Sequence, residues 1–381
     1  MRRTRVMPAA ILLSGVLCGC GSPLVSTAGS EDTNPSAGAT KPTGLPLITK
    51  TNALNGAIVV SIKSPTPGAT IAYTLDGATP NPNASATVLY EAPFLVASKL
   101  TVKDIAKAPG YAASAVASEA FSPDIAHGTL VWSDEFTNST RADAEPNPLT
   151  WTYDTGPGAD CCGNNELENY CAWGSTTPPC NPTHPNVYED TAGILHIVAR
   201  EPSRGVYTSA RLKTQGRFSF HYGRIEARMK LPESQGMWPA FWLLGNNITT
   251  ISWPACGELD VMEHIDGSDP QNEGFDWVQG SIHGAGLNGG VQYHPAGFSA
   301  AAWHTYGMIW SKGRIQYYVD SPSNIYATFT PETQTGVWPF DAGPQFILLN
   351  LAVGGDWPGS PNAQTPFPSE IQVDYVRLYT N

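Results

Sequence analysis

Charged residues are scarce in this chain, and no part of it has the pattern of a helix longer than a turn or two. Lysine, arginine, aspartate and glutamate together make up only 14% of its 381 residues. Glycine (37), proline (33), tryptophan (11) and tyrosine (15) are instead plentiful. This composition excludes a mainly helical protein and indicates turn-rich β structure with exposed aromatic side chains.

Basic residues are in the minority. The chain has 21 lysines and arginines against 33 acidic residues, a formal net charge of -12. Such a surface repels nucleic acid and anionic membranes, so we expect neither as a partner. A neutral polysaccharide fits this charge, whereas a sulfated polymer fits it poorly. We expect the protein to be a monomer.

The apolar run near the start of the chain, from Val6 to about Leu17, is too short to span a bilayer. Three arginines precede it, and this combination of charge and length is typical of a secretory signal. We therefore expect residues 1–20 to be a signal peptide of an exported bacterial protein, secreted or held at the cell surface.

The end of that run, Leu17-Cys18-Gly19-Cys20, resembles a bacterial lipoprotein box. In such a box the last cysteine becomes the first residue of the mature protein and is lipidated. Cys18 departs from the usual pattern. The segment predicts a lipid anchor on Cys20, and we expect no other membrane contact. The alternatives are an ordinary exported signal and an N-terminal extension with two idle cysteines.

Five further cysteines are Cys161, Cys162, Cys171, Cys180 and Cys256. In an exported protein they indicate disulfides with one thiol left over, and the sequence does not fix the pairing. A zinc site is the alternative. No His or Cys pair has the usual short metal spacing, so a stapled loop is favoured.

Two N-terminal segments precede the main part of the chain. Residues 21–45 are rich in Ser, Thr, Gly, Ala and Pro and predict a flexible linker. Residues 46–123 contain short alternating runs, at 57–62, 70–75 and 100–106, and predict a small Ig-like β-sandwich. The stretch PGATIAYTLDGATPNPNAS resembles the small module at the C-terminus of chitobiases. Such a module would be a spacer or a sugar-binding unit.

Residues 129–381 form one long all-β region with a strand every 8 to 12 residues. The runs at 223–230 and 314–319 alternate polar and apolar residues, so each shows one face to water or ligand. A jelly-roll sandwich is the architecture that this pattern predicts.

The segment Trp253-Pro-Ala-Cys-Gly-Glu-Leu-Asp-Val-Met-Glu-His carries three acids on one predicted strand. Glu258 and Asp260 share a face by alternation. Regular alternation would place Glu263 on the opposite face. A β-bulge around Val261-Met262 would return Glu263 to the side of the other two.

Three neighbouring carboxylates repel one another and raise at least one pKa, as a general acid near neutrality requires. Glycoside hydrolysis uses such a pair. One carboxylate attacks the anomeric carbon while the other protonates the leaving oxygen, and retention needs a gap of about 5 Å between them. A solvated strand face and a calcium-binding acid cluster are the alternatives.

This segment resembles the catalytic strand of glycoside hydrolase family 16 in its bulged form, Glu-x-Asp-x-x-Glu, which is typical of the laminarinase (endo-β-1,3-glucanase) branch. Matching motifs follow in family order over about 250 residues. They are LVWSDEF, GNNELENY, YTSARLKTQGRFSFHYGRIEARMKLP, QGMWPAFWLLG, SIHG, WHTYGMIW, YYVD, LLNLAVGGDWPGSP and VDYVRLY. The resemblance implies a concanavalin-like β-jelly-roll. Leu259 replaces the commoner Ile, and the cysteine-rich loop at 161–180 looks like an insertion near one end of the cleft.

The resemblance implies that Glu258 is the nucleophile, Glu263 the acid/base and Asp260 the assisting acid. It further implies the substrate-binding residues Trp238, Trp242, Trp253, Asn164, Asn165, Arg211, His283, Asn350 and Trp357. Three of these have a structural alternative. Trp242 could be a core residue beside Phe241, Arg211 could pair with Glu226, and His283 could be a hydrogen-bonded structural residue.

The resemblance also implies a structural calcium site formed by Glu135, Asp374 and the carbonyl of Gly193. Oxygen ligands suit Ca²⁺, and the alternative is two solvated acids. No cofactor is implied for catalysis.

The sequence therefore predicts an endo-acting, retaining β-1,3-glucanase. Mixed-linkage glucanase, agarase and carrageenase activities are alternatives within the same family. A non-catalytic β-glucan-binding lectin is the alternative from another class, but a lectin should have lost at least one acid of the pair, and both glutamates are present.

Overall fold

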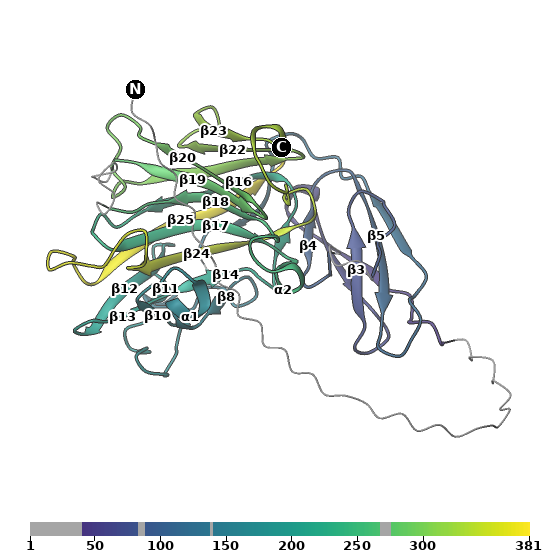
Figure 1. Cartoon of the computed structure of the whole chain (residues 1–381), viewed down its shortest axis with the longest axis horizontal. Helices are drawn as coiled ribbons and strands as arrows, with labels where there is room; N and C mark the ends of the chain where they lie inside the picture. Colours follow the sequence, from purple (N-terminus) through teal and green to yellow (C-terminus); the bar gives the residue numbers. More distant parts are fainter. Residues whose placement is uncertain (1–39, 83–87, 138–139, 267–275) are drawn as a thin grey trace, which may run out of the picture. The chain divides into compact units, whose positions relative to one another are not determined.

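The computed structural model describes residues 40–82, 88–137, 140–266 and 276–381, apart from the side chains of Cys161 and Cys162. The predicted signal peptide, the lipid-anchor cysteine and most of the predicted linker lie outside these residues. The described part is built almost wholly of strands, as predicted (Figure 1).

In the described residues the first sheet has 11 strands. In spatial order these are β1 (Leu47–Asn52), β2 (Ile58–Lys63), β4 (Phe94–Val96), β15 (Ser219–Phe220), β24 (Gln345–Val353), β17 (Met237–Gly245), β18 (Glu258–Glu263), β19 (Val278–Gly284) and β20 (Leu287–Tyr293), with β14 (Arg211–Lys213) paired to β24 and β8 (Thr152–Asp154) paired to β14.

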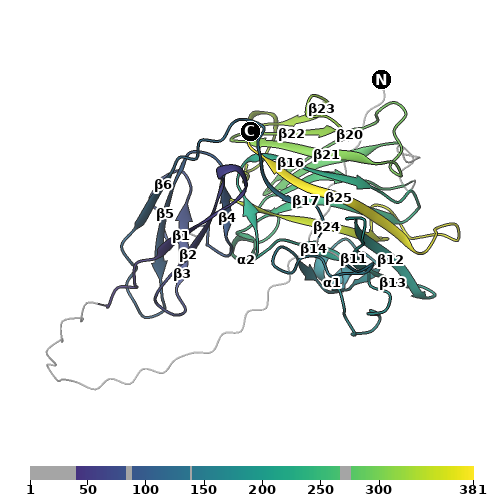
Figure 2. The same ribbon diagram turned by 180° about the vertical axis from the view of Figure 1, so that it is seen from behind.

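The second sheet also has 11 strands within the described ranges, and Figure 2 shows several of them from behind. In spatial order these are β23 (Ile325–Phe329), β22 (Arg314–Val319), β21 (His304–Ser311), β16 (Gly223–Lys230), β25 (Ser369–Tyr379), β12 (Leu195–Ser203), β13 (Val206–Ser209), β10 (Glu168–Tyr170) and β9 (Gly156–Pro157), with β11 (Val187–Glu189) paired to β12 and β7 (Leu130–Asp134) paired to β25.

The remaining elements are short or belong to the N-terminal module. A three-stranded sheet contains β3 (Thr70–Thr74), β5 (Leu100–Lys107) and β6 (Ala117–Phe121), and the helices are α1 (Gly158–Cys162), α2 (Ile248–Ile251) and the 3-10 turns η1 (Leu54–Gly56) and η2 (Pro331–Thr333). None of the helices within the described ranges is long and apolar enough to cross a membrane.

The main core lies between the two large sheets, and alternation along the strands decides which side chains enter it. On β17, Phe241 and Leu243 are fully buried in this core, whereas Trp238 and Trp242 point the other way and are half-buried. On β24, Leu349 and Leu351 enter the core and Asn350 faces outward from it. We call the side of the first sheet that points away from this core the active-site face.

Strands β16 and β22 begin and end where the sequence predicts, and β2, β3 and β5 lie within one residue of the predicted runs at 57–62, 70–75 and 100–106. The jelly roll preceded by a small β-sandwich is confirmed. The module has its own apolar cluster, which includes Val60, Phe94 and Val102.

The module is joined to the jelly roll more closely than the sequence predicts. Strand β4 of the module pairs in parallel with β15 of the jelly roll, so that one sheet runs through both. Leu95 of β4 belongs to the main core.

The predicted linker boundary at residue 45 is wrong. Thr43 is 3% exposed, and its hydroxyl donates to the carbonyl of Ala112 at 2.8 Å. A buried hydroxyl needs such a partner, so this part of the segment is fixed on the module.

Candidate active site

The acidic strand β18 contains the predicted bulge. On the β17 side, Phe241 pairs with Met262 and Trp242 pairs with Asp260, so Val261 is passed over. The side chains of Val261 and Met262 are both buried in the main core. Two consecutive core-facing residues shift the alternation by one, which turns Glu263 to the same side as Glu258 and Asp260. The three acids therefore share the active-site face.

Neighbouring side chains hold each of the two glutamates. Glu263 accepts hydrogen bonds from the indole nitrogen of Trp238 at 3.2 Å and from the hydroxyl of Ser281 at 3.0 Å. Glu258 accepts one from the indole nitrogen of Trp253 at 2.8 Å. These donors fix both carboxylates in place and leave each with capacity for a substrate atom.

His283 belongs to the neighbouring strand β19, and its side chain lies next to the three acids. Its Nε2 is 3.1 Å from Oδ2 of Asp260 and 3.9 Å from Oε1 of Glu258. The imidazole therefore lies within ion-pair distance of two of the three acids. It helps to hold Asp260, which lies between the two glutamates.

The pKa values of all three acids are raised. Burial raises the pKa of Glu258, and the negative charge of Asp260 raises it further. The pKa of Asp260 is raised by burial and by Glu263, and that of Glu263 by burial. Close like charges cannot all ionise together, so the row retains a proton near neutrality. A retained proton is what a general acid must supply.

Three of the four predicted tryptophans lie around the acids. Trp238 and Trp253 donate to Glu263 and Glu258 as described above. Trp357 meets Trp238 edge-on, with ring centroids 5.4 Å apart. Trp253 is 57% exposed, which leaves its face free for a sugar. Flat apolar rings with one polar edge suit pyranose stacking.

Trp242 lies outside the main core, where its neighbour Phe241 is buried, and packs against a small separate apolar cluster that includes Leu244 and Phe346. Its indole nitrogen donates to Oδ1 of Asn350 at 2.7 Å. The guanidinium of Arg211 lies over its ring, 4.5 Å from the centroid. Trp242, Arg211 and Asn350 thus form one group on the active-site face.

The alternative prediction, that Arg211 pairs with Glu226, is wrong. Arg211 forms an ion pair with Asp154 at 3.0 Å, from strand β8 beside it. Glu226 lies on β16 of the other sheet, where it accepts from the hydroxyl of Tyr318 at 2.5 Å and pairs with Arg224. The two residues belong to different sheets, which the sequence pattern could not show.

Asn164 and Asn165 lie on a loop that meets the loop of Trp357. The side chain of Asn165 donates to both carboxylate oxygens of Asp356 at 3.0 Å. The carbonyl of Asn164 accepts from the backbone of Asp356 at 2.9 Å. Both asparagines are exposed, so they remain available to sugar hydroxyls.

Some residues of the site were not predicted. Ser281 donates to Glu263, and Tyr170 and Glu166 lie behind Asn350. Ser281 could have been found, because it is two residues before His283 on the same strand and so faces the same way. The GNNELENY motif contains Glu166 and Tyr170 but gives no signal that they reach a strand 180 residues away.

The predicted calcium ligands are engaged by arginines. Both carboxylate oxygens of Glu135 accept from Arg377, at 2.9 and 2.8 Å. Asp374 pairs with Arg228 at 2.6 Å. A guanidinium at each carboxylate opposes a cation there, so the arrangement does not fit Ca²⁺ bound by these two side chains.

Within the described residues, Glu258, Asp260 and His283 also bring three ligand atoms within 4.8 Å of one another. Calcium prefers oxygen ligands only, and an imidazole nitrogen does not suit it. The acid row therefore does not support the alternative of a calcium-binding cluster.

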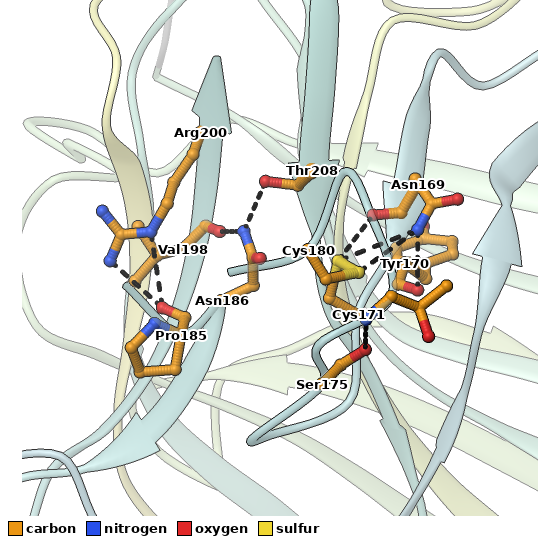
Figure 3. Close-up of a disulfide and its surroundings, with 11 residues drawn as sticks. Asn169, Tyr170, Cys171, Ser175, Cys180, Pro185, Asn186, Val198, Arg200 and Thr208 are labelled. Atoms are coloured by element: carbon orange, nitrogen blue, oxygen red, sulfur yellow. Dashed lines mark hydrogen bonds between the residues drawn. A yellow bond between two sulfur atoms is a disulfide. The ribbon is translucent and has the colours of Figure 1, made fainter. Parts of the chain in front are cut away.

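The stapled-loop prediction is confirmed by a disulfide between Cys171 and Cys180, directly after β10 (Figure 3). Cys256 is buried and free, in agreement with one thiol left over. The side chains of Cys161 and Cys162 lie outside the described residues, so the second bridge stays a prediction.

Comparison with known families gives two matches. Residues 179–377 match the family described as glycosyl hydrolases family 16, and residues 60–121 match one described as Fn3 associated. The likeness of the module to that of chitobiases stays a prediction.

Individual relatives agree with the family match. A β-glucanase of Rhodothermus marinus is 37% identical over 273 residues, which cover 66% of this chain and 85% of the relative. The α subunit of clotting factor G from Tachypleus tridentatus is 34% identical over 255 residues, but the chain spans only 34% of its length.

A solved structure, the laminarinase catalytic domain of Thermotoga maritima, superposes with a TM-score of 0.56 at 35% identity, covering 67% of this chain and 99% of that domain. With the three acids on one face of a jelly roll, these matches show that the chain belongs to glycosyl hydrolase family 16 and is a glycoside hydrolase.

Proposed function

We propose that the protein cleaves internal β-1,3 linkages of a laminarin-like glucan and retains the anomeric configuration. The bulged row of Glu258, Asp260 and Glu263 supports this proposal most directly. The relatives support the same proposal, since several are laminarinases or glucan endo-1,3-β-glucosidases.

In the proposed reaction Glu258 attacks the anomeric carbon and Glu263 gives its proton to the leaving oxygen. The bond from anomeric carbon to leaving oxygen breaks as the bond to Glu258 forms. Glu263 then takes a proton from water, and the hydroxide releases the sugar from Glu258. Asp260 and His283 steady the nucleophile, and the tryptophans orient the sugar rings.

Product analysis tests the linkage and the mode of cleavage. Laminarin should give short oligosaccharides early in the reaction, and proton NMR should show the β anomer forming first. Good activity on agarose, κ-carrageenan or lichenan without activity on laminarin would show that one of the other family activities is the right one. Binding of laminarin without turnover would support the lectin.

We further propose that the protein is exported and anchored through a lipid on Cys20. Mass spectrometry of the mature N-terminus tests this. A diacylglyceryl group on Cys20 would support the anchor, and a free N-terminus beyond residue 20 in soluble protein would rule it out.

A further inference from the structure

A chain of hydrogen bonds leads from the active-site face into the protein. The indole nitrogen of Trp242 donates to Oδ1 of Asn350 at 2.7 Å. The amide nitrogen of Asn350 donates to the hydroxyl of Tyr170 at 3.2 Å, and that hydroxyl donates to Oε2 of Glu166 at 2.9 Å. The indole of Trp242 can only donate, and the carboxylate of Glu166 accepts from Tyr170 and, at 3.3 Å, from the amide of Asn164, so the direction of the chain is fixed at both ends.

That end is a pair of buried acids. Glu166 and Glu168 are 6% and 1% exposed. The backbone N–H of Val353 on β24 donates to Oε2 of Glu168 at 2.6 Å, whereas Oε1 of Glu168 has no hydrogen-bond partner among the described residues. Burial and the charge of Glu166 raise the pKa of Glu168 to about 8, so Glu168 keeps its proton at neutrality.

The strand that carries Tyr170 is held on three sides. Strand β10 pairs with β9 and with β13. Directly after it, Cys171 is bonded to Cys180, and its backbone N–H donates to the carbonyl of Ser209 at 2.8 Å. Figure 3 shows Tyr170 beside this disulfide. Tyr170 is fully buried, so its hydroxyl is presented to Asn350 from a rigid support.

Few other charged side chains lie near Glu166 and Glu168. On the side of Tyr170 the guanidinium of Arg211 from β14 lies over Trp242, and Asp154 of β8 pairs with it. On the other side the side-chain amide of Asn165 donates a hydrogen bond to the carboxylate of Asp356. Loss of the proton on Glu168 would place a second negative charge beside Glu166 among buried groups. Repulsion between the two carboxylates would then disturb Tyr170, which donates to Glu166.

We propose that Glu166, Glu168 and Tyr170 are positioning residues that orient Asn350 and Trp242 for sugar binding. The inference rests on the proposed function only in that a β-glycan binds the active-site face. It does not depend on which linkage is cleaved.

Tyr170→Phe tests the chain directly. The variant loses one hydroxyl and leaves Asn350 free to rotate. We expect KM for the polysaccharide that the wild type cleaves to rise about five-fold, with kcat within about two-fold. Tyr318→Phe is the matched control, because Tyr318 also donates to a buried glutamate, Glu226, but on the other sheet. Its KM should stay at the wild-type value.

Glu168→Gln tests the role of the protonated acid. A glutamine keeps the shape of the neutral carboxyl group, can still accept from the N–H of Val353 and cannot ionise. The wild-type KM should rise as the pH passes about 8, and the KM of Glu168→Gln should stay level over the same range. An unchanged KM in Tyr170→Phe, or an alkaline rise that persists in Glu168→Gln, would overturn the proposal.

Two further measurements keep the outcomes separate. Thermal unfolding of each variant shows whether the fold is kept. Affinity electrophoresis in gels that contain laminarin, lichenan or agarose measures binding without turnover. A wild type that binds but cleaves nothing would refute the proposed function alone, and weaker binding by Tyr170→Phe than by Tyr318→Phe would still support the positioning role.

Discussion

Glu258 and Glu263 share one strand but have different hydrogen-bond partners. Trp253 donates to the first, whereas Trp238 and Ser281 donate to the second. The positions of both glutamates were predictable from the sequence, because the alternation that decides them involves only a few neighbouring residues. The bulge followed from the chemistry, since a charged Glu263 pointing into the core would cost several kcal/mol.

The division of roles predicts different rescue products. Glu258→Ala should lose turnover, and azide with an activated fluoride donor should give a product of inverted configuration. Glu263→Ala should lose about 10²–10⁴-fold in kcat on natural glucan. It should still form the glycosyl-enzyme with a good leaving group, so that azide gives a retained product. NMR of the products decides, and swapped configurations would reverse the assignment.

Asp104 is a residue that we expect to lower the stability of the N-terminal module. It is fully buried in the module, neither oxygen has a hydrogen-bond partner among the described residues, and burial raises its pKa to about 6. An acid with a raised pKa favours the folded state only while it is protonated. Above pH 6 its charge therefore destabilises the module.

Asp104→Asn should thus increase the free energy of unfolding at pH 7 by about 1–3 kcal/mol. The gain should vanish near pH 4, where the aspartate is protonated as well. Urea unfolding at the two pH values checks this. An equal effect at both would mean that the charge is not responsible.

Residues behind the site were harder to predict than those in it. Tyr170 and Glu166 matter through Asn350, which lies 180 residues further along the chain. Their contact depends on how β10 of one sheet approaches β24 of the other. Alternation within a strand carries no information about that approach.

At the scale of elements, three strands of the second sheet are tied by a histidine. His196 of β12 contacts Asp190, after β11, and Glu370 of β25, both at 3.1 Å. Burial alone would lower the pKa of His196, but the two carboxylates outweigh burial and raise it. The same contacts lower the pKa of Glu370.

The direction of these shifts sets a pH window. The raised pKa of His196 means that its contribution is complete below about pH 6.5 and is lost as the pH rises through the folded-state pKa. The carboxylates contribute above about pH 4.5 and lose their contribution as the pH falls. The contacts of His196 with Asp190 and Glu370 should therefore stabilise the folded state most between these two pH values.

His196→Gln should lower the free energy of unfolding by about 1 kcal/mol more at pH 5.5 than at pH 8.5. The ring also stacks on Tyr188, with centroids 4.7 Å apart, and loss of this contact should cost the same at both pH values. Urea unfolding separates the two effects. A pH-independent difference would show that only the stacking matters.

The bounds of strands with clear alternation were predictable to within one residue, and those of β16 and β22 were predicted without error. The bounds of strands of only two or three residues were not predictable. Strand β15 is only Ser219–Phe220, and such a pair has no period. Its existence depends on the partners on either side of it.

At the scale of the whole molecule, this short strand joins the two folded parts. Strand β4 lies on one side of β15 and β24 on the other. The side chain of Ser219 donates to the carbonyl of Pro93 at 3.2 Å, and that of Asn55 donates to the carbonyl of Leu130 at 2.8 Å. The sequence predicted a separate module because each part has its own pattern, and the pairing between them is a tertiary property.

A chain that begins at residue 124 should therefore be less stable than the chain with its module. Removal would uncover the edge of β15 and take Leu95 out of the main core. We expect a Tm lower by several degrees and aggregation that increases with protein concentration, by calorimetry and light scattering. An unchanged Tm would mean that the module is only a spacer.

The pairing of β4 with β15 also has a consequence for synthesis. A chain made from its N-terminus completes the module first, and domains generally fold as units as they emerge. Strand β4 ends at Val96, whereas β15 begins at Ser219. Through more than a hundred residues of elongation, the nascent module would carry an open strand edge, the kind of surface that captures neighbouring chains. That edge is only three residues long, which limits the number of hydrogen bonds that a wrong partner could form with it.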